Sequence, residues 1–163
     1  MGYSLTIGEA VIETSDERIK IAAKGAHLPE APAFGEPTDH TSARWPSYTA
    51  WHDFARAAGI HELFYGQGWD RDLRGYRECS EGFHREGGML AEHPGAALIT
   101  KADADYVSAA RAKFIADHPG VISGFADDAV EMDPRATLAR LEWLDFWFRW
   151  AVENCANPVL ENT

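Results

Sequence analysis

The sequence lacks the features that would assign it to a membrane or to an oxidising compartment. No apolar run approaches the roughly 20 residues that a bilayer-spanning helix needs, so we expect no membrane association. Residues 1–12 show neither the basic nor the apolar region of a secretory signal. The two cysteines, Cys79 and Cys155, have no CxxC spacing, which disfavours a disulfide framework. These absences predict a cytoplasmic protein.

The sequence also lacks the short motifs of common catalytic and cofactor sites. Neither phosphate-binding pattern, GxGxxG or GxxxxGK[ST], occurs, and the nucleophile pattern GxSxG is missing. Acid–base catalysis by two carboxylates stays open, because 26 acidic residues offer many pairs. Without HxH or HExxH spacing, the sequence predicts no metal site and no cofactor. Six of the seven histidines are spread along the chain, at His40, His52, His61, His84, His93 and His118.

Basic residues are scarce relative to acidic ones. The chain has 15 lysines and arginines against 26 acids, for a formal net charge of −11. Such an acidic field repels phosphate backbones, so we expect no general nucleic-acid binding. Two interpretations of the charge remain open. The acidic charge keeps a small protein soluble, or it allows the protein to bind a basic surface on a host protein.

The residues that are present indicate a single α+β domain spanning residues 1–163. A length of 163 residues with 45% hydrophobic residues and six tryptophans is enough to bury a core. Residues 1–25 are β-rich, with Arg18-Ile-Lys-Ile alternating charged and apolar side chains, which predicts a β-hairpin or small antiparallel sheet. Four prolines make residues 26–46 a long irregular loop.

Three main helices are expected to pack on this hairpin or sheet. Ser47 and Gly59 are typical ends of a first helix within a helical region at 47–65. Thr100 and Asp103 have capping-box spacing and open a second helix, 100–117. Residues 66–99 between these helices are rich in glycine and charge, and we interpret them as mostly loop.

The strongest helix signal is the aromatic segment 133–155. Asp133 is a good N-cap, and Pro134 occupies the first helical position, where its missing N–H costs nothing. Apolar residues cover most of the circumference, which predicts a helix surrounded by protein. The polar residues form one narrow stripe, in which Asp145 and Arg149 have the spacing of a helical ion pair.

The first candidate site lies where the proline-rich loop enters the first helix. Arginine can hold a phosphate or carboxylate, aromatic rings can stack on a planar ligand, and a helix start offers backbone N–H groups to an anion. The alternative is structural, with the aromatic residues in the core and the serine acting only as a cap. The candidate ligand-binding residues here are Arg44, Trp45, Ser47, Tyr48, Trp51 and His52.

A second candidate cluster lies in the segment 65–85, where several arginines follow one another closely. If this loop folds back on itself, the arginines form a local positive patch on an acidic protein. The alternative is a solvated loop with charges of alternating sign. The candidate ligand-binding residues of this cluster are Trp69, Arg74, His84 and Arg85.

Four segments together resemble a known family. They are Trp45-Pro46-Ser47-Tyr48, Glu62-Leu63-Phe64-Tyr65-Gly66, Leu90-Ala91-Glu92-His93-Pro94-Gly95 and Leu138-Ala139-Arg140-Leu141-Glu142-Trp143-Leu144. Their order resembles small uncharacterised proteins encoded by bacteriophages and prophages, over most of the chain after the hairpin. The resemblance implies a role in the host cytoplasm, where such proteins bind a host protein or sequester a signalling nucleotide. The family has no assigned activity, so the resemblance identifies no catalytic residue.

Three functional hypotheses follow. The leading one is a non-enzymatic, phage-type binding protein that captures a small anionic or planar, nucleotide-like ligand and so antagonises host defence. The second is an acidic inhibitor of a basic host protein. The third is a small hydrolase that uses His52 or His84 with nearby acids. A homo-oligomer stays open, since an exposed tryptophan on the last helix would need a covering surface.

Overall fold

The structure is a computed structural model, and it describes only part of the chain. For residues 11–15, 18–24, 69–70 and 75–76 only the backbone is described. The described residues are 2–15, 18–24, 46–66, 69–70, 75–76, 88–91, 93–124 and 133–163.

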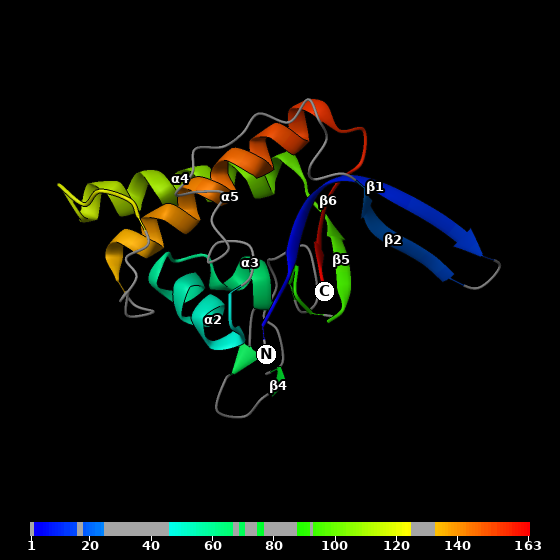
Figure 1. Ribbon diagram of the computed structural model, residues 1–163, viewed down its shortest axis with the longest axis horizontal. Coiled ribbons are helices and arrows are strands. Elements are labelled where there is room, and N and C mark those ends of the chain that lie inside the picture. The colour runs from blue at the N-terminus through cyan, green and yellow to red at the C-terminus, as the bar shows by residue number, and fades with distance from the viewer. Residues whose placement is uncertain are drawn as a thin grey trace.

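The sheet has four antiparallel strands in the order β2-β1-β6-β5. They are β1 (Leu5–Ser15), β2 (Arg18–Lys24), β5 (Gly95–Leu98) and β6 (Pro158–Asn162). Backbone hydrogen bonds between Ser4 and Thr163 continue the β1–β6 pairing to the ends of the chain. As a result, the chain ends lie near each other (Figure 1).

The long strand β1 pairs with two different partners along its length. Residues Leu5 to Glu9 pair with β6, whereas Glu9 to Ser15 pair with β2. The β1–β2 hairpin therefore continues past the sheet and projects from the body of the molecule (Figure 1). The predicted N-terminal hairpin is confirmed. A separate small ladder joins β3 (Trp69–Asp70) to β4 (Gly75–Tyr76).

Much of the segment 66–99, which we interpret as mostly loop, lies outside the described residues, but at its C-terminal end Gly95–Leu98 forms the strand β5, which the sequence did not predict. The sequence of this strand, Gly-Ala-Ala-Leu, shows no alternation of apolar and polar residues. Glycine and alanine also have low strand propensity, so neither signal predicts a strand here. Pairing with the neighbouring strand β6 stabilises β5 instead. Ala96 pairs with Glu161 and Leu98 with Val159 of β6, a strand that the sequence also failed to predict.

Four helices are described, and their ends follow local capping signals. Ser47 caps α2 (Tyr48–Ala57), whose exit at Gly59 takes a φ of 71° that glycine favours. The short helix α3 (His61–Tyr65) follows directly. Thr100 and Asp103 close a capping box on α4 (Lys101–Asp117). Asp133 caps α5 (Pro134–Asn154), with Pro134 in the first turn.

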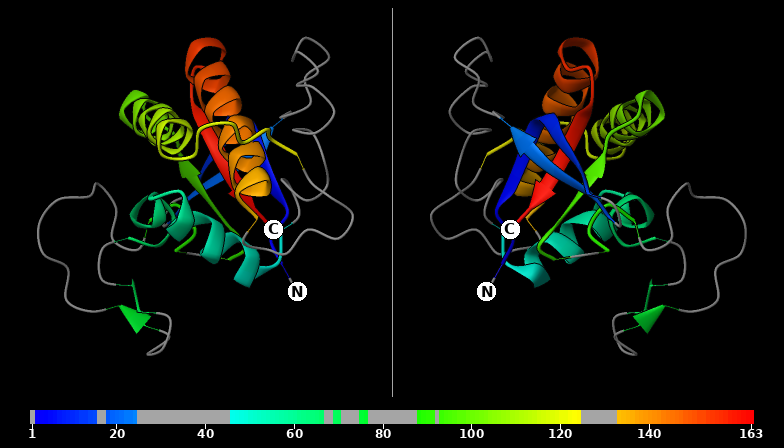
Figure 2. Two further views of the ribbon diagram at one scale, coloured as in Figure 1. Left: turned by 90° about the vertical axis from the view of Figure 1, so that its left-hand side faces the viewer. Right: turned by 90° about the vertical axis from the view of Figure 1, so that its right-hand side faces the viewer.

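Helix α5 is the centre of the fold. It contacts α2 and α4 as well as strands β1 and β6, and Figure 2 shows it lying across the strands. The prediction that protein surrounds this helix is confirmed by the burial of Trp143, Leu144 and Phe148. The α+β fold class is likewise confirmed. The largest fully buried side chains include Trp51, Trp143, Phe54, Phe64, Phe148, Leu5, Ile7 and Leu160.

Candidate functional site

Three polar side chains from distant parts of the chain form one hydrogen-bonded row. The hydroxyl of Tyr48 lies 2.8 Å from Nε2 of His93, and Nδ1 of His93 lies 2.7 Å from Oδ1 of Asn162. Nδ2 of Asn162 donates in turn to the carbonyl of Gly95, at 3.2 Å. Asn162 is fully buried and Tyr48 is half-buried, whereas His93 is exposed. We call these three residues the Tyr48–His93–Asn162 row.

The orientation of the Asn162 amide fixes the hydrogen-bond roles along the row. Because Nδ2 donates to Gly95, Oδ1 is the atom that faces His93, and an amide oxygen only accepts. Nδ1 of His93 must therefore carry a proton. In the neutral ring Nε2 then has a lone pair, which accepts a hydrogen bond from the Tyr48 hydroxyl. A protonated ring would donate from both nitrogens.

The ring of Tyr3 packs against the outer end of the row. The ring centroids of Tyr3 and Tyr48 are 4.7 Å apart, and each of these rings lies 5.3 Å from that of His93, all in edge-on geometry. Edge-on aromatic contacts of this kind are attractive and restrict ring rotation. Tyr3, Tyr48 and His93 therefore form an ordered aromatic cluster, which we call the aromatic corner.

Local structure positions each member of the corner. Tyr48 is the first residue of α2, which has no acidic side chain in its first turn, so no side chain of that turn opposes an anion there. His93 precedes β5, and Asn162 ends β6. Backbone contact holds the N-terminus in place, since Tyr3 N donates to Pro46 O at 2.9 Å. The approach is so close that a Cβ on Gly2 would lie 2.2 Å from that carbonyl oxygen.

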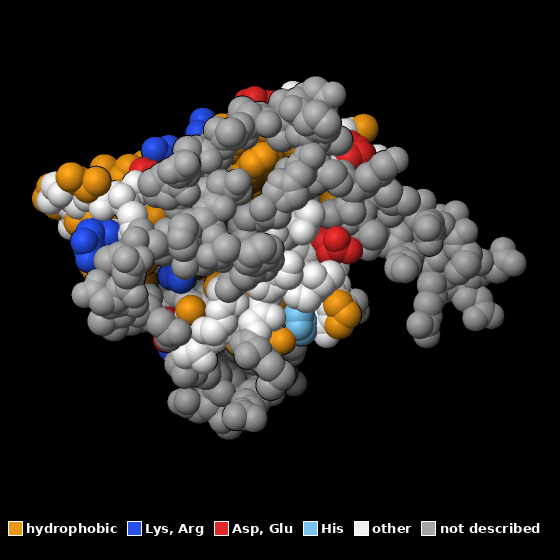
Figure 3. Space-filling model, in the orientation of Figure 1, with side chains coloured by type: hydrophobic (Ala, Val, Ile, Leu, Met, Phe, Trp, Pro, Cys, Tyr) orange, Lys and Arg blue, Asp and Glu red, His pale blue; other side chains and the backbone are white. Residues whose placement is uncertain are grey.

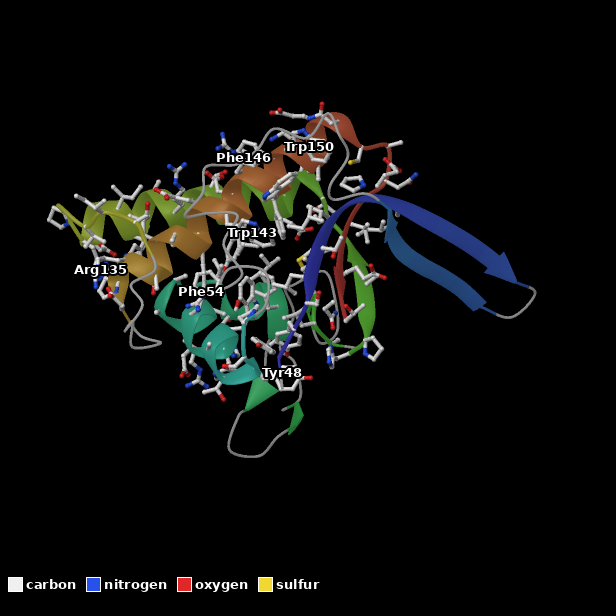
Figure 4. All side chains as sticks on the ribbon, in the orientation of Figure 1. Tyr48, Phe54, Arg135, Trp143, Phe146 and Trp150 are labelled. Carbon is white, nitrogen blue, oxygen red and sulfur yellow. The ribbon has the colours of Figure 1, made fainter. Side chains whose placement is uncertain are left out.

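The aromatic corner runs from the core to the surface, because Tyr3 is buried, Tyr48 is half-buried and His93 is exposed. Figure 4 places Tyr48 at the lower end of the molecule, while Phe54 and Trp143 lie in its interior. On the face drawn in Figure 3, histidine atoms are exposed beside hydrophobic side chains near that lower end. His93 and the following Pro94 are both exposed. A ligand can therefore reach the imidazole from solvent without a change of fold.

A second cluster joins the middle of α2 to α3. Nε2 of His52 lies 3.1 Å from Nε2 of His61, and the ring of Tyr65 stacks on that of His61 with centroids 4.9 Å apart. Burial, together with the smaller effects of the nearby His52 and Arg56, lowers the pKa of His61 to about 4. Burial raises the pKa of Tyr65, to which Tyr3 and Asp53 also contribute. His61 is therefore neutral near pH 7.

The structure separates the predicted ligand-binding residues into three groups. Tyr48 lies in the aromatic corner, and His52 belongs to the second cluster. Ser47 acts as the N-cap of α2, accepting from Ala50 N at 3.0 Å, and Trp51 is fully buried against Phe54 and Phe64, so the structural alternative holds for both. Trp69 lies in β3 with its side chain undescribed, and the rest lie outside the described residues, namely Arg44, Trp45, Arg74, His84 and Arg85.

Sequence reasoning missed most of the corner and of the second cluster, namely Tyr3, His61, Tyr65, His93 and Asn162. Only His93 carried a signal, because the tripeptide His-Pro-Gly recurs at His118. The two copies differ in structure. The first leads into β5, whereas the second ends α4, with Gly120 at a φ of 84°. His52 is buried and His84 lies outside the described residues, so the hydrolase hypothesis stays a prediction.

Comparisons with family models, with curated proteins and with solved structures found no match to this chain. Within the described ranges, no helix combines the length and the apolar character required to cross a membrane. The same part of the chain holds no group of three His, Cys, Asp or Glu side chains arranged to bind a metal ion.

Proposed function

We propose that this chain is a non-enzymatic binding protein that captures a small anionic and planar ligand at the aromatic corner. The observation that carries the proposal is the Tyr48–His93–Asn162 row. A buried asparagine orients an exposed histidine, and the hydroxyl of a half-buried tyrosine occupies the other ring nitrogen. Because the His93 imidazole is already oriented before a ligand arrives, less conformational entropy is lost when the ligand binds.

The chemistry of the corner favours an anionic ligand. When an anion replaces the bond between Tyr48 and His93, the Tyr48 hydroxyl can donate to it, and so can Nε2 of a protonated His93. The backbone N–H groups at the start of α2 add positive potential, and no acidic side chain in the first turn opposes it. The partly exposed rings of Tyr48 and His93 can supply the apolar contacts that a base or another planar group prefers.

The identity of the ligand rests on the sequence resemblance alone. Small phage proteins of this type suggest a host signalling nucleotide, whose sequestration would counter a host defence. A nucleotide combines the two features that the corner selects, because it carries both a phosphate and a planar base. We therefore place nucleotides first among the ligands to be tried.

Calorimetric titration with a panel of linear and cyclic nucleotides tests the proposal. We expect saturable binding of at least one nucleotide, weakened about tenfold or more by His93→Gln, since a charge-assisted hydrogen bond contributes roughly 1.5–3 kcal/mol. Tyr106→Phe is the matched control, because this tyrosine lies on α4 and bonds to Gly59 O at 3.1 Å. An absence of binding across the panel, or equal affinity in wild type and His93→Gln, would reject the proposal.

The net charge of −11 favours one alternative, an acidic inhibitor of a basic host protein. Surface charge of one sign steers binding and makes it sensitive to ionic strength. This alternative predicts capture of a basic partner that weakens steeply between low and physiological salt and that His93→Gln does not affect. Capture that is insensitive to salt would count against it.

A further inference from the structure

The two histidines of the second cluster face each other through the same ring nitrogen. His52 lies in α2 and His61 is the first residue of α3, and their Nε2 atoms are 3.1 Å apart. Their separation of nine residues matches no metal-binding motif, so sequence spacing does not pair them. The tight turn at Gly59 between the two helices brings them together.

The geometry of the pair shows that the two rings meet at an angle. Their centroids are 4.7 Å apart with planes at 86°, so the centroid separation exceeds the nitrogen separation of 3.1 Å by only 1.6 Å. Two rings meeting head-on would place their centroids further apart, since each centroid lies behind its nitrogen. The two nitrogens are hydrogen-bonded to each other, and their angled arrangement is compatible with both Nε2 atoms facing one common position beside the pair.

That position suits a transition-metal ion. Nitrogens 3.1 Å apart, each about 2.0–2.1 Å from an ion, subtend an angle of about 95–100° at it. This value lies between octahedral and tetrahedral geometry, so only a small ring movement is needed to reach either. Neutral imidazole is a good ligand for zinc, copper and nickel, whereas calcium and magnesium prefer oxygen.

The surroundings hold both rings in place. Oδ1 of Asp53 lies 3.6 Å from Nδ1 of His52, the ring nitrogen that does not contact His61. A carboxylate in this position favours a proton on Nδ1, which leaves Nε2 to act as a ligand. Tyr65 stacks on His61 at 29° and fixes the plane of that ring. His52 is buried, but His61 is partly exposed, so an ion can reach the pair from solvent.

We propose that His52 and His61 together bind one divalent transition-metal ion through their Nε2 atoms, with water completing the coordination. The described residues provide no group of three ligands, so the site proposed among them has these two protein ligands, and we expect it to bind its ion reversibly. The proposal does not depend on the binding function of the aromatic corner. If metal binding at His52 and His61 is disproved, ligand binding at the aromatic corner is unaffected, and the reverse also holds, because His93 does not belong to the histidine pair.

Calorimetric titration of the untagged full chain with ZnCl₂ tests this site. We expect one saturable Zn²⁺ site per chain and no saturable heat with MgCl₂ under the same conditions. Because it removes one of two ligands, His61→Gln should weaken Zn²⁺ binding by about tenfold or more. The matched control is His118→Gln at the end of α4, where the imidazole bonds only locally, to Phe114 O at 3.0 Å, and this variant should bind as wild type does.

If His61→Gln does not fold, the ¹H–¹⁵N NMR spectrum of the histidine rings in the wild-type protein still tests the proposal. In ¹⁵N-labelled protein, Zn²⁺ should shift the Nε2 resonances of His52 and His61 together and leave that of His118 in place. Absence of a saturable Zn²⁺ site, or a site whose affinity survives in a folded His61→Gln, would overturn the proposal. Shifts confined to other histidines would overturn it as well.

Discussion

Nη1 of Arg111 on α4 donates a 2.8 Å hydrogen bond to Oδ2 of Asp145 on α5, although the Asp145 side chain is only 3% exposed. The same carboxylate accepts hydrogen bonds from the Ser108 hydroxyl and from Nη2 of Arg149, the latter at 3.1 Å. The predicted pairing of Asp145 with Arg149 is confirmed. The polar stripe of α5 thus lies partly against α4, and a buried carboxylate with three partners joins the two helices.

We expect Asp145→Asn to lower the free energy of unfolding by about 2–4 kcal/mol. Removing one partner of a buried ion pair leaves the other charges uncompensated, at about 3–5 kcal/mol, and we reduce this figure because both arginines are partly exposed. Urea unfolding measures the loss. The control is Asp105→Asn, which removes an exposed pair with Lys101 and should leave the midpoint nearly unchanged. Equal effects of the two substitutions would contradict this account.

The capping box of α4 gives a second prediction. Thr100 Oγ1 accepts from Asp103 N at 3.1 Å, and the Asp103 carboxylate accepts from Thr100 N at 2.7 Å. Thr100→Ala should therefore cost about 1 kcal/mol of stability, whereas Thr100→Ser should retain most of it. Amide hydrogen exchange in the first turn of α4 should accelerate only in the alanine variant. Unchanged exchange there would show that tertiary packing alone holds the turn.

Lowering the pH should destabilise the protein through His61. Its pKa falls from 6.5 in the unfolded chain to about 4 in the folded protein, mainly because of burial, with His52 and Arg56 adding to the effect. The unfolded state therefore binds more protons than the folded state between these values, so stability is full above pH 6.5 and declines as the pH falls towards 4.

The difference in unfolding free energy between wild type and His61→Gln isolates this effect, because other titrating groups contribute to both proteins. Measured in the presence of EDTA, the advantage of wild type should shrink steadily from pH 7 to pH 4. An advantage that grows on acidification would mean that His61 gains rather than loses favourable contacts on protonation.

The helices could be predicted from sequence because their signals are local. Asp133 and Pro134 stand side by side at the start of α5, and Thr100 and Asp103 are three residues apart, so each cap is complete within one turn. Strands β5 and β6 escaped prediction because their stability depends on partners far along the chain. Leu98 pairs with Val159, and Ile7 of β1 pairs with Leu160.

The candidate site was predictable only in part for the same reason. Tyr48 was selected because it follows a helix-capping serine within an aromatic segment. Its partner His93 lies 45 residues away, and Asn162 lies a further 69 residues along the chain, so no periodicity or spacing connects them. Trp51 was selected on its residue type, but burial rather than binding accounts for it.

The hydrogen bond between Asn162 and His93 gives a further prediction. Asn162→Leu removes the acceptor for His93 Nδ1 and the donor to Gly95 O, at a cost of about 1–3 kcal/mol for the buried groups left without partners. We expect the folded variant to bind the nucleotide more weakly than wild type, because the imidazole is no longer held in one tautomer. Calorimetry compares the two proteins. Wild-type affinity in Asn162→Leu would show that orientation of His93 is unimportant.

The most direct test of the proposed function is the long-range ¹H–¹⁵N spectrum of the histidine rings during addition of the best-binding nucleotide. In the unbound protein, His93 should show a protonated Nδ1 and an Nε2 that accepts a hydrogen bond, as the contact with Asn162 requires. On saturation, the Nε2 resonance of His93 should shift strongly while that of His118 stays in place. Saturation without any change at His93 would contradict the aromatic corner as the binding site.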